Sequence, residues 1–143
     1  GNTEGIKKIV DAGIDSLRVS LNSGTNAVYN AYYRPVQYTL DQVRQSLRYA
    51  ADHGVYTYLN LLTFPGINDC TDEVESLLQL VQDNDVKAIQ VRNLNIDPET
   101  MKPIIDLLQG EPLGVPAFLN ILAEELPTVA IGNYTKPFRR KKA

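Results

Sequence analysis

The residues best placed to do chemistry are polar side chains that alternate with aliphatic ones in three short segments. Ser20 and Asn22 belong to the first segment, Asn60 to the second and Arg92 to the third. Hydroxyl and amide groups hydrogen-bond polar ligands, and a guanidinium binds a carboxylate or phosphate through two parallel hydrogen bonds. Hydroxyls and amides are poor acids and bases at neutral pH, so the pattern predicts a binding site and no catalytic residue.

The sequence does not indicate a second type of reactive site. The one histidine, His53, precedes Gly54 at the expected end of a helix, where we interpret it as structural. The one cysteine, Cys70, stands at an expected helix start, which can lower a thiol pKa, but no histidine base is near it in sequence. No cluster of Cys, His, Asp or Glu has the spacing of metal ligands, so no metal site is predicted.

The composition is that of a globular domain without a nucleic-acid or membrane partner. The chain has 143 residues, of which 43% are hydrophobic and 22% charged, and a net charge of -3. No apolar run approaches the ~20 residues that cross a membrane. The basic segment 136–142 is interpreted as a solvated tail. A single cysteine cannot form an internal disulfide, so we expect a cytoplasmic protein.

Helix and strand patterns alternate along the chain. The strands that we predict span residues 16–21, 55–63, 88–95 and 129–132, and the helices span 3–12, 26–33, 39–54, 71–82, a segment that opens at 97, and 117–126. Thr39 and Gln42 are expected to form a capping box at one helix start. The strand starts are 39, 33 and 41 residues apart, which is the length of a strand–helix unit in a parallel sheet. The predicted fold class is therefore α/β.

Three of the predicted strands each have one polar face, which favours a barrel over a flat sheet. The alternating polar positions are Arg18, Ser20 and Asn22; Tyr56, Tyr58 and Asn60; and Gln90 and Arg92. In a flat doubly wound sheet, helices cover both faces and the strands are apolar throughout. We therefore expect a partial TIM-type (β/α) barrel whose lumen is lined by polar side chains.

Three segments together resemble the core of the radical S-adenosylmethionine (radical SAM) enzymes. Residues 13–22, G-I-D-S-L-R-V-S-L-N, resemble the fourth strand of that core. Residues 60–69, which end in P-G-I-N-D, resemble its fifth strand and following loop, and residues 89–95, I-Q-V-R-N-L-N, its sixth strand. The resemblance covers residues 5–97 and leaves 98–143 as a C-terminal extension. It implies that residues 1–143 form one incomplete domain, the C-terminal half of the barrel.

The resemblance implies an enzyme that uses S-adenosylmethionine and a [4Fe-4S] cluster to generate a 5′-deoxyadenosyl radical. That radical would abstract hydrogen from an unidentified small-molecule or peptide substrate. Ser20 matches a cofactor-contacting serine, Asn22 falls where relatives often carry Asp, and Asn95 falls at a cofactor-contacting position after the sixth strand. Asn60 and Arg92 complete the expected cofactor site. The three-cysteine motif is absent, so we expect neither a cluster nor activity in residues 1–143 alone.

Two other interpretations stay open at this point. One is half of an ordinary TIM-barrel lyase or aldolase, which needs clustered His and Glu ligands that the sequence lacks. The other is a non-catalytic α/β interaction module whose polar strand faces pair with one another. The leading strand, 16–21, is expected to be an edge through which the protein self-associates. Tyr29, Tyr32 and Tyr33 fall on one side of a helix, where they either pack or cover a ligand.

Overall fold

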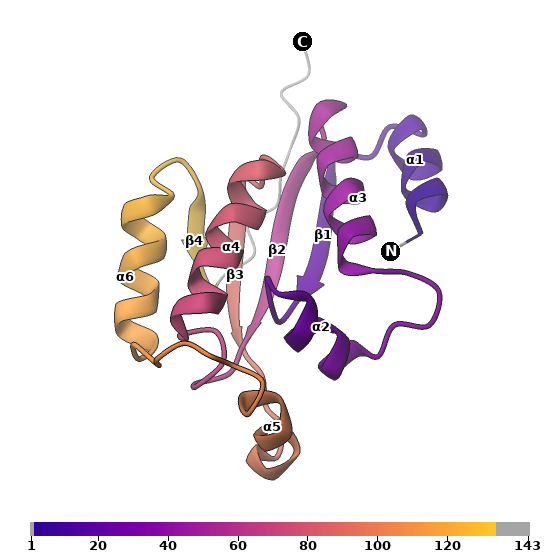
Figure 1. Ribbon diagram of the computed structural model, residues 1–143. Coiled ribbons are helices and arrows are strands. Elements are labelled where there is room, and N and C mark those ends of the chain that lie inside the picture. The colour runs from indigo at the N-terminus through magenta and orange to yellow at the C-terminus, as the bar shows by residue number, and fades with distance from the viewer. Residues whose placement is uncertain (1, 134–143) are drawn as a thin grey trace.

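The computed structural model describes residues 2–133, which form a parallel sheet and its connecting helices (Figure 1). The strands are β1 (Ser16–Leu21), β2 (Tyr56–Thr63), β3 (Ala88–Asn93) and β4 (Ala130–Gly132). The helices are α1 (Thr3–Asp11), α2 (Asn26–Tyr33), α3 (Leu40–Asp52), α4 (Thr71–Asp83), α5 (Pro98–Ile105) and α6 (Val115–Glu125). All three strand pairs are parallel, so the α/β prediction is confirmed.

The strands follow one another in the sheet in the order β1-β2-β3-β4. The crossover helices α3, α4 and α6 lie side by side over one face of this sheet (Figure 1). Sequential strand order with helices on one side is the arrangement of a (β/α) barrel wall, in which the other face lines the interior. Helices α2 and α5 lie at the carboxyl ends of the strands.

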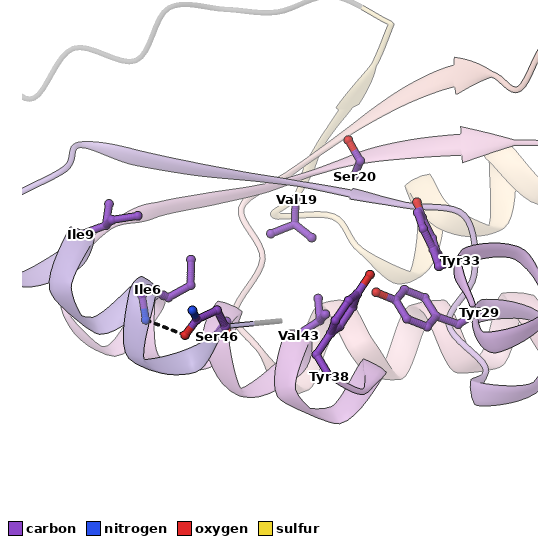
Figure 2. Close-up of a pocket in the computed structure, with 11 residues that line it drawn as sticks. Ile6, Ile9, Val19, Ser20, Tyr29, Tyr33, Tyr38, Val43 and Ser46 are labelled. Carbon is purple, nitrogen blue, oxygen red and sulfur yellow. Dashed lines mark hydrogen bonds between the residues drawn. The ribbon is translucent and has the colours of Figure 1, made fainter. Parts of the chain in front are cut away.

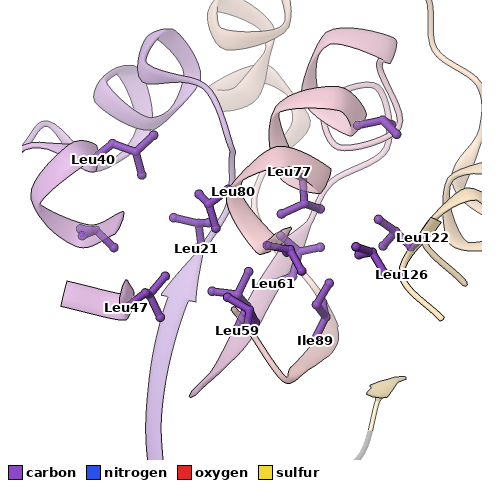
Figure 3. Packing of buried hydrophobic residues seen from close by; sticks show 14 of the residues in the cluster. Leu21, Leu40, Leu47, Leu59, Leu61, Leu77, Leu80, Ile89, Leu122 and Leu126 are labelled. Carbon is purple, nitrogen blue, oxygen red and sulfur yellow. The ribbon is translucent and has the colours of Figure 1, made fainter. Parts of the chain in front are cut away.

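Every second residue of the central strands faces these helices and forms the main core (Figure 3). Leu59 and Leu61 of β2 are fully buried, and Leu21 of β1 and Ile89 of β3 are buried beside them. They pack against leucines of the three crossover helices, among them Leu47, Leu77, Leu80 and Leu122. Each such side chain contributes about 1.5–3 kcal/mol on burial. The intervening residues are thereby turned to the opposite face of the sheet.

Local sequence sets the helix boundaries. The backbone N–H of Gln42 donates to Thr39 Oγ1 at 3.3 Å, and that of Thr39 donates to Gln42 Oε1 at 3.0 Å, so the predicted capping box is present. Helix α2 ends at Tyr33 and is followed by the cap residue Arg34, whose φ is 47°. Pro35 disfavours helical geometry in Arg34, the residue before it. The predicted boundaries lie within two residues of the observed ones.

The segment between α5 and α6 is tied back to the connection between β2 and α4. The N–H of Leu113 donates to the carbonyl oxygen of Asp69 at 2.8 Å, and Cys70 and Pro112 form an isolated antiparallel bridge. Gly110 lies so close to the first turn of α4 that a Cβ there would collide with it. The chain therefore leaves the sheet after β3, forms α5 and returns to the sheet before α6 begins.

Candidate functional site

The face of the sheet opposite the helices carries the polar side chains of three strands. Ser20 and Asn60 are register partners in β1 and β2, and the amide of Asn60 donates to Ser20 Oγ at 3.0 Å. Gln90 is the register partner of Asn60 on β3, and Arg92 follows two residues later with its side chain exposed. Within residues 2–133 no helix covers this face, which we call the open face. The sequence prediction that Ser20, Asn60 and Arg92 share a face is confirmed.

Aromatic and cationic side chains extend the open face toward the amino ends of the strands. The ring centroids of Tyr56 and Tyr58 are 6.2 Å apart, and Arg18 is the register partner of Tyr58. Among the described residues, neither Arg18 nor Arg92 has an ion-pair partner. Two guanidinium groups without counterions suit a ligand that carries a carboxylate or phosphate.

Asn22 is buried, unlike Ser20 and Arg92. It follows the last residue of β1 and is 1% exposed. Its carbonyl oxygen accepts a hydrogen bond from Asn68 Nδ2 at 2.8 Å, and neither side-chain polar atom of Asn22 has a partner in the described part of the chain. The predicted end of the strand at Leu21 is confirmed, and the chain leaves the sheet there toward the loop that contacts α4. The alternation that grouped Asn22 with the exposed Ser20 does not account for its burial, and its cofactor contact stays a prediction.

Glu73, in the first turn of α4, makes these contacts. Its buried carboxylate accepts hydrogen bonds from Ser23 Oγ at 2.9 Å, from the N–H of Gly24 at 3.0 Å and from Thr25 Oγ1. Burial raises the pKa of the Glu73 carboxyl, and the three hydrogen bonds act in the opposite direction. Sequence reasoning missed Glu73, because a glutamate in the first turn of a helix ordinarily faces solvent near the helix dipole.

The remaining amides and carboxylates at the strand ends have unequal surroundings. Asn95 is exposed in the segment between β3 and α5, and its cofactor contact stays a prediction. Asn68 and Asp69 are buried and shape the loop after β2. Asn68 Oδ1 accepts from the N–H of Phe64 at 2.8 Å, and Asp69 Oδ1 accepts from that of Gly66 at 2.6 Å. These two residues therefore fix the loop rather than face a ligand.

Cys70 lacks the surroundings of a reactive thiol or a cluster ligand. It is 3% exposed, and its Sγ lies 3.3 Å from the carbonyl oxygen of Gly110 and 3.6 Å from that of Gly66. Burial raises the pKa of the Cys70 thiol, and neighbouring acidic side chains, first Asp69, add to the effect. Residues 2–133 contain no group of three or more His, Cys, Asp or Glu that could hold a metal ion. The described residues therefore do not fit a [4Fe-4S] cluster.

A recess of about 340 Å³ lies beside the outer edge of β1 (Figure 2). Tyr29, Tyr33 and Tyr38 line it together with Ser20 and aliphatic side chains of α1 and α3. Tyr29 is 4% exposed, and its ring centroid is 4.7 Å from that of Tyr33. Burial, with neighbouring tyrosines, raises the pKa of Tyr33 to about 12. Of the two interpretations of the tyrosine cluster, the structure favours packing.

A sequentially ordered parallel sheet with helices on one face and polar residues on the other defines a partial (β/α) barrel. The family model of the radical SAM superfamily matches residues 2–81, more than half of the chain. The chain therefore belongs to the radical SAM superfamily, whose typical members use S-adenosylmethionine and a [4Fe-4S] cluster. No curated protein matches it. Across residues 2–133, every helix is too short or too polar to span a membrane.

Proposed function

We propose that this chain forms the S-adenosylmethionine-binding wall of a radical SAM enzyme. In this proposal β1, β2 and β3 are strands four to six of the barrel. The observation that carries the proposal is that Ser20, Asn60 and Arg92 lie on the one sheet face that no described helix covers. Superfamily membership supports S-adenosylmethionine as the ligand of that face.

The chemistry of the open face suits the groups of this cofactor. Ser20 Oγ accepts a hydrogen bond from Asn60, which leaves the Ser20 O–H and the Asn60 carbonyl oxygen to bind ribose hydroxyls. Arg92 is suited to the cofactor carboxylate, and Asn95 lies close behind it in sequence. S-adenosylmethionine supplies the radical chemistry of the superfamily; the protein orients it and excludes water. Substrate is expected at the carboxyl ends of the strands.

The [4Fe-4S] cluster needs ligands that the described residues do not provide. The thiol of Cys70 is buried and lies within hydrogen-bond distance of two backbone carbonyl oxygens. We propose that another part of the complete barrel holds the cluster beside the open face. The chain by itself is then expected to bind S-adenosylmethionine without cleaving it.

The test is a calorimetric titration of the chain with S-adenosylmethionine, combined with NMR mapping of the amides that shift. We expect saturable binding that shifts amides of β1 to β3. Arg92→Ala should weaken binding about tenfold, which corresponds to ~1.4 kcal/mol. Arg48→Ala is the matched control, because Arg48 is a half-exposed guanidinium of α3 paired with Asp52 at 3.0 Å. Absence of binding, or an equal loss in both variants, would contradict the proposal.

The Ser20–Asn60 hydrogen bond also fits a non-catalytic module in which polar strand residues satisfy one another. Ser20→Ala separates the two functions. If the hydrogen bond serves only the sheet, neither the wild type nor Ser20→Ala should bind S-adenosylmethionine. If Ser20 binds the cofactor, the wild type should bind and Ser20→Ala should bind more weakly. In both cases the change in stability should be small, because the Asn60 amide is only half-buried and can bond to water.

A further inference from the structure

A second cavity lies on the helix side of the sheet, with the sheet between it and the open face. Its volume is about 510 Å³, which is within the range of small-molecule sites. Apolar side chains of β3, β4 and α6 form its body, namely Val91, Ile131 and Leu119. Polar groups stand at one end, where Thr63 and Asn93 close the carboxyl ends of β2 and β3. The cavity thus combines a mainly apolar interior with a few polar groups.

Thr63, in the wall of this cavity, has a buried hydroxyl without a hydrogen-bond partner within residues 2–133. Its side chain is 5% exposed, and its Oγ1 has no partner among the described residues. A buried hydroxyl without a partner is costly and rare in native proteins. Thr57 lies on the same face of the same strand, and its Oγ1 donates to the carbonyl oxygen of Asp85 at 3.2 Å. The missing partner is therefore particular to the end of β2 that lines the cavity.

The amino end of α6 places further donors at the same cavity. Its N-cap is Gly114, and no side chain caps the first turn. The N–H of Gly114 donates to Asp69 Oδ2 at 3.1 Å, and Pro116 has no N–H. The first four N–H groups of a helix have no partner inside it, which leaves those of Val115 and Ala117. Val115 is itself part of the cavity wall.

The charge at this end of α6 decides which ligands fit. A helix amino terminus ordinarily attracts an anion. Here the Asp69 carboxylate, which is 3% exposed, already lies against it and bonds to Gly114. A second negative charge in the cavity would be repelled by this carboxylate at low local dielectric. The surroundings therefore favour a neutral acceptor over an anion.

We propose that this cavity binds a neutral, mostly apolar molecule that presents a hydrogen-bond acceptor, such as an aromatic ring nitrogen or a carbonyl oxygen. The acceptor receives a hydrogen bond from the hydroxyl of Thr63, the N–H of Val115 stands at the same cavity, and the apolar body lies on Val91, Leu119 and Ile131. Because the sheet separates this cavity from the open face, the inference does not depend on the proposed binding of S-adenosylmethionine.

Three probes of one size test the ligand class in NMR titrations of the chain. Quinoline is neutral at pH 7.5 and has one ring nitrogen, naphthalene has no acceptor, and 2-naphthoate carries a negative charge. We expect quinoline to shift the amides of Val115 and Ala117 saturably and to bind roughly tenfold more tightly than naphthalene, the value of one good hydrogen bond. Tighter binding of 2-naphthoate, or no saturable shift at these amides, would overturn the proposal.

Two variants on β2 test the role of the unpaired hydroxyl. Thr63→Val removes it at constant shape, and should weaken quinoline binding about fivefold while leaving naphthalene binding unchanged. Thr57→Val is the matched control and should leave quinoline binding unchanged. Leu119→Trp fills the cavity and should abolish binding of both neutral probes. Unchanged quinoline affinity in the Thr63 variant or the Leu119 variant would place the probe elsewhere and overturn the inference.

Discussion

Two threonines on the helix-facing side of β2 differ in whether their hydroxyl groups have a hydrogen-bond partner. The hydroxyl of Thr57 donates to the carbonyl oxygen of Asp85, whereas the buried hydroxyl of Thr63 has no partner in the described structure. Thr57→Val should therefore lower the free energy of unfolding by about 1 kcal/mol, and Thr63→Val should leave it unchanged or raise it slightly. Urea unfolding with unchanged m values measures both. An equal loss in the two variants would show that Thr63 is already satisfied.

Glu73 makes stability depend on pH in an unusual direction. Its folded-state pKa is raised above the ordinary value of 4.5, mainly by burial. As the pH rises through 4.5, the unfolded chain loses this proton first, so the contribution of Glu73 to the free energy of unfolding falls until the folded pKa is passed. Glu73→Gln does not titrate. The wild-type stability minus that of Glu73→Gln should therefore decrease from pH 4 to pH 7.

Urea unfolding at several pH values between 4 and 7 measures this difference. A difference that grows with pH would mean that the three hydrogen bonds to the carboxylate outweigh its burial. Glu73→Ala should cost about 2–4 kcal/mol at pH 4, because it leaves the buried donors of Ser23 and Gly24 unpaired, and this cost should fall as the pH rises.

At the scale of elements, the loop after β1 is packed directly on helix α4. A Cβ on Gly24 would lie 2.7 Å from the backbone nitrogen of Leu77. Gly24→Ala should therefore lower stability by about 1–3 kcal/mol, since backbone atoms cannot move aside as a side chain can. Gly5→Ala in α1 is the control, and should be neutral or stabilising by up to ~1 kcal/mol. Thermal unfolding of both variants checks the difference; equal melting temperatures would contradict the packing of this loop.

Strand β1 has a paired side and an unpaired side. Among the described strands it pairs with β2 alone, whereas β2 is paired with both β1 and β3. We propose that the protein self-associates through the unpaired edge of β1. Alternate amides of β1 should then exchange with solvent rapidly in dilute samples and slow at high concentration, while those of β2 stay protected throughout. Exchange rates in β1 that do not depend on concentration would contradict this.

Much of the element arrangement could be predicted from sequence, because the alternation of side chains has a period of two. Ser20, Asn60 and Arg92 fall in the polar half of that pattern, and the structure places them on one face. The pattern does not account for Asn22, which is buried directly after the strand and accepts a hydrogen bond from Asn68, 46 positions away. Glu73 and the unpaired Thr63 were missed for the same reason, since their partners, or the lack of them, depend on tertiary packing.

At the scale of the whole molecule, a ligand of the open face should stabilise the entire sheet. S-adenosylmethionine at 100 times its dissociation constant should add about 2.7 kcal/mol to the free energy of unfolding. For a domain of this size, that corresponds to a rise in Tm of about 5–10 °C. At the same cofactor concentration, a tenfold weaker affinity leaves Arg92→Ala about half of the rise, whereas Arg48→Ala should keep all of it. Equal rises in the two variants would place the ligand away from Arg92.

The segment that contains α5 is hydrogen-bonded at both of its ends to residues 63–69, at and after the end of β2. The N–H of Leu94 donates to the carbonyl oxygen of Thr63 at 2.9 Å, and the N–H of Leu113 donates to the carbonyl oxygen of Asp69 at 2.8 Å. With its ends anchored, this region can change at its exposed positions without displacing the sheet, whereas Gly110 and the buried Met101 are fixed by their contacts. Evolution can therefore vary the exposed surface of α5 independently of the barrel wall.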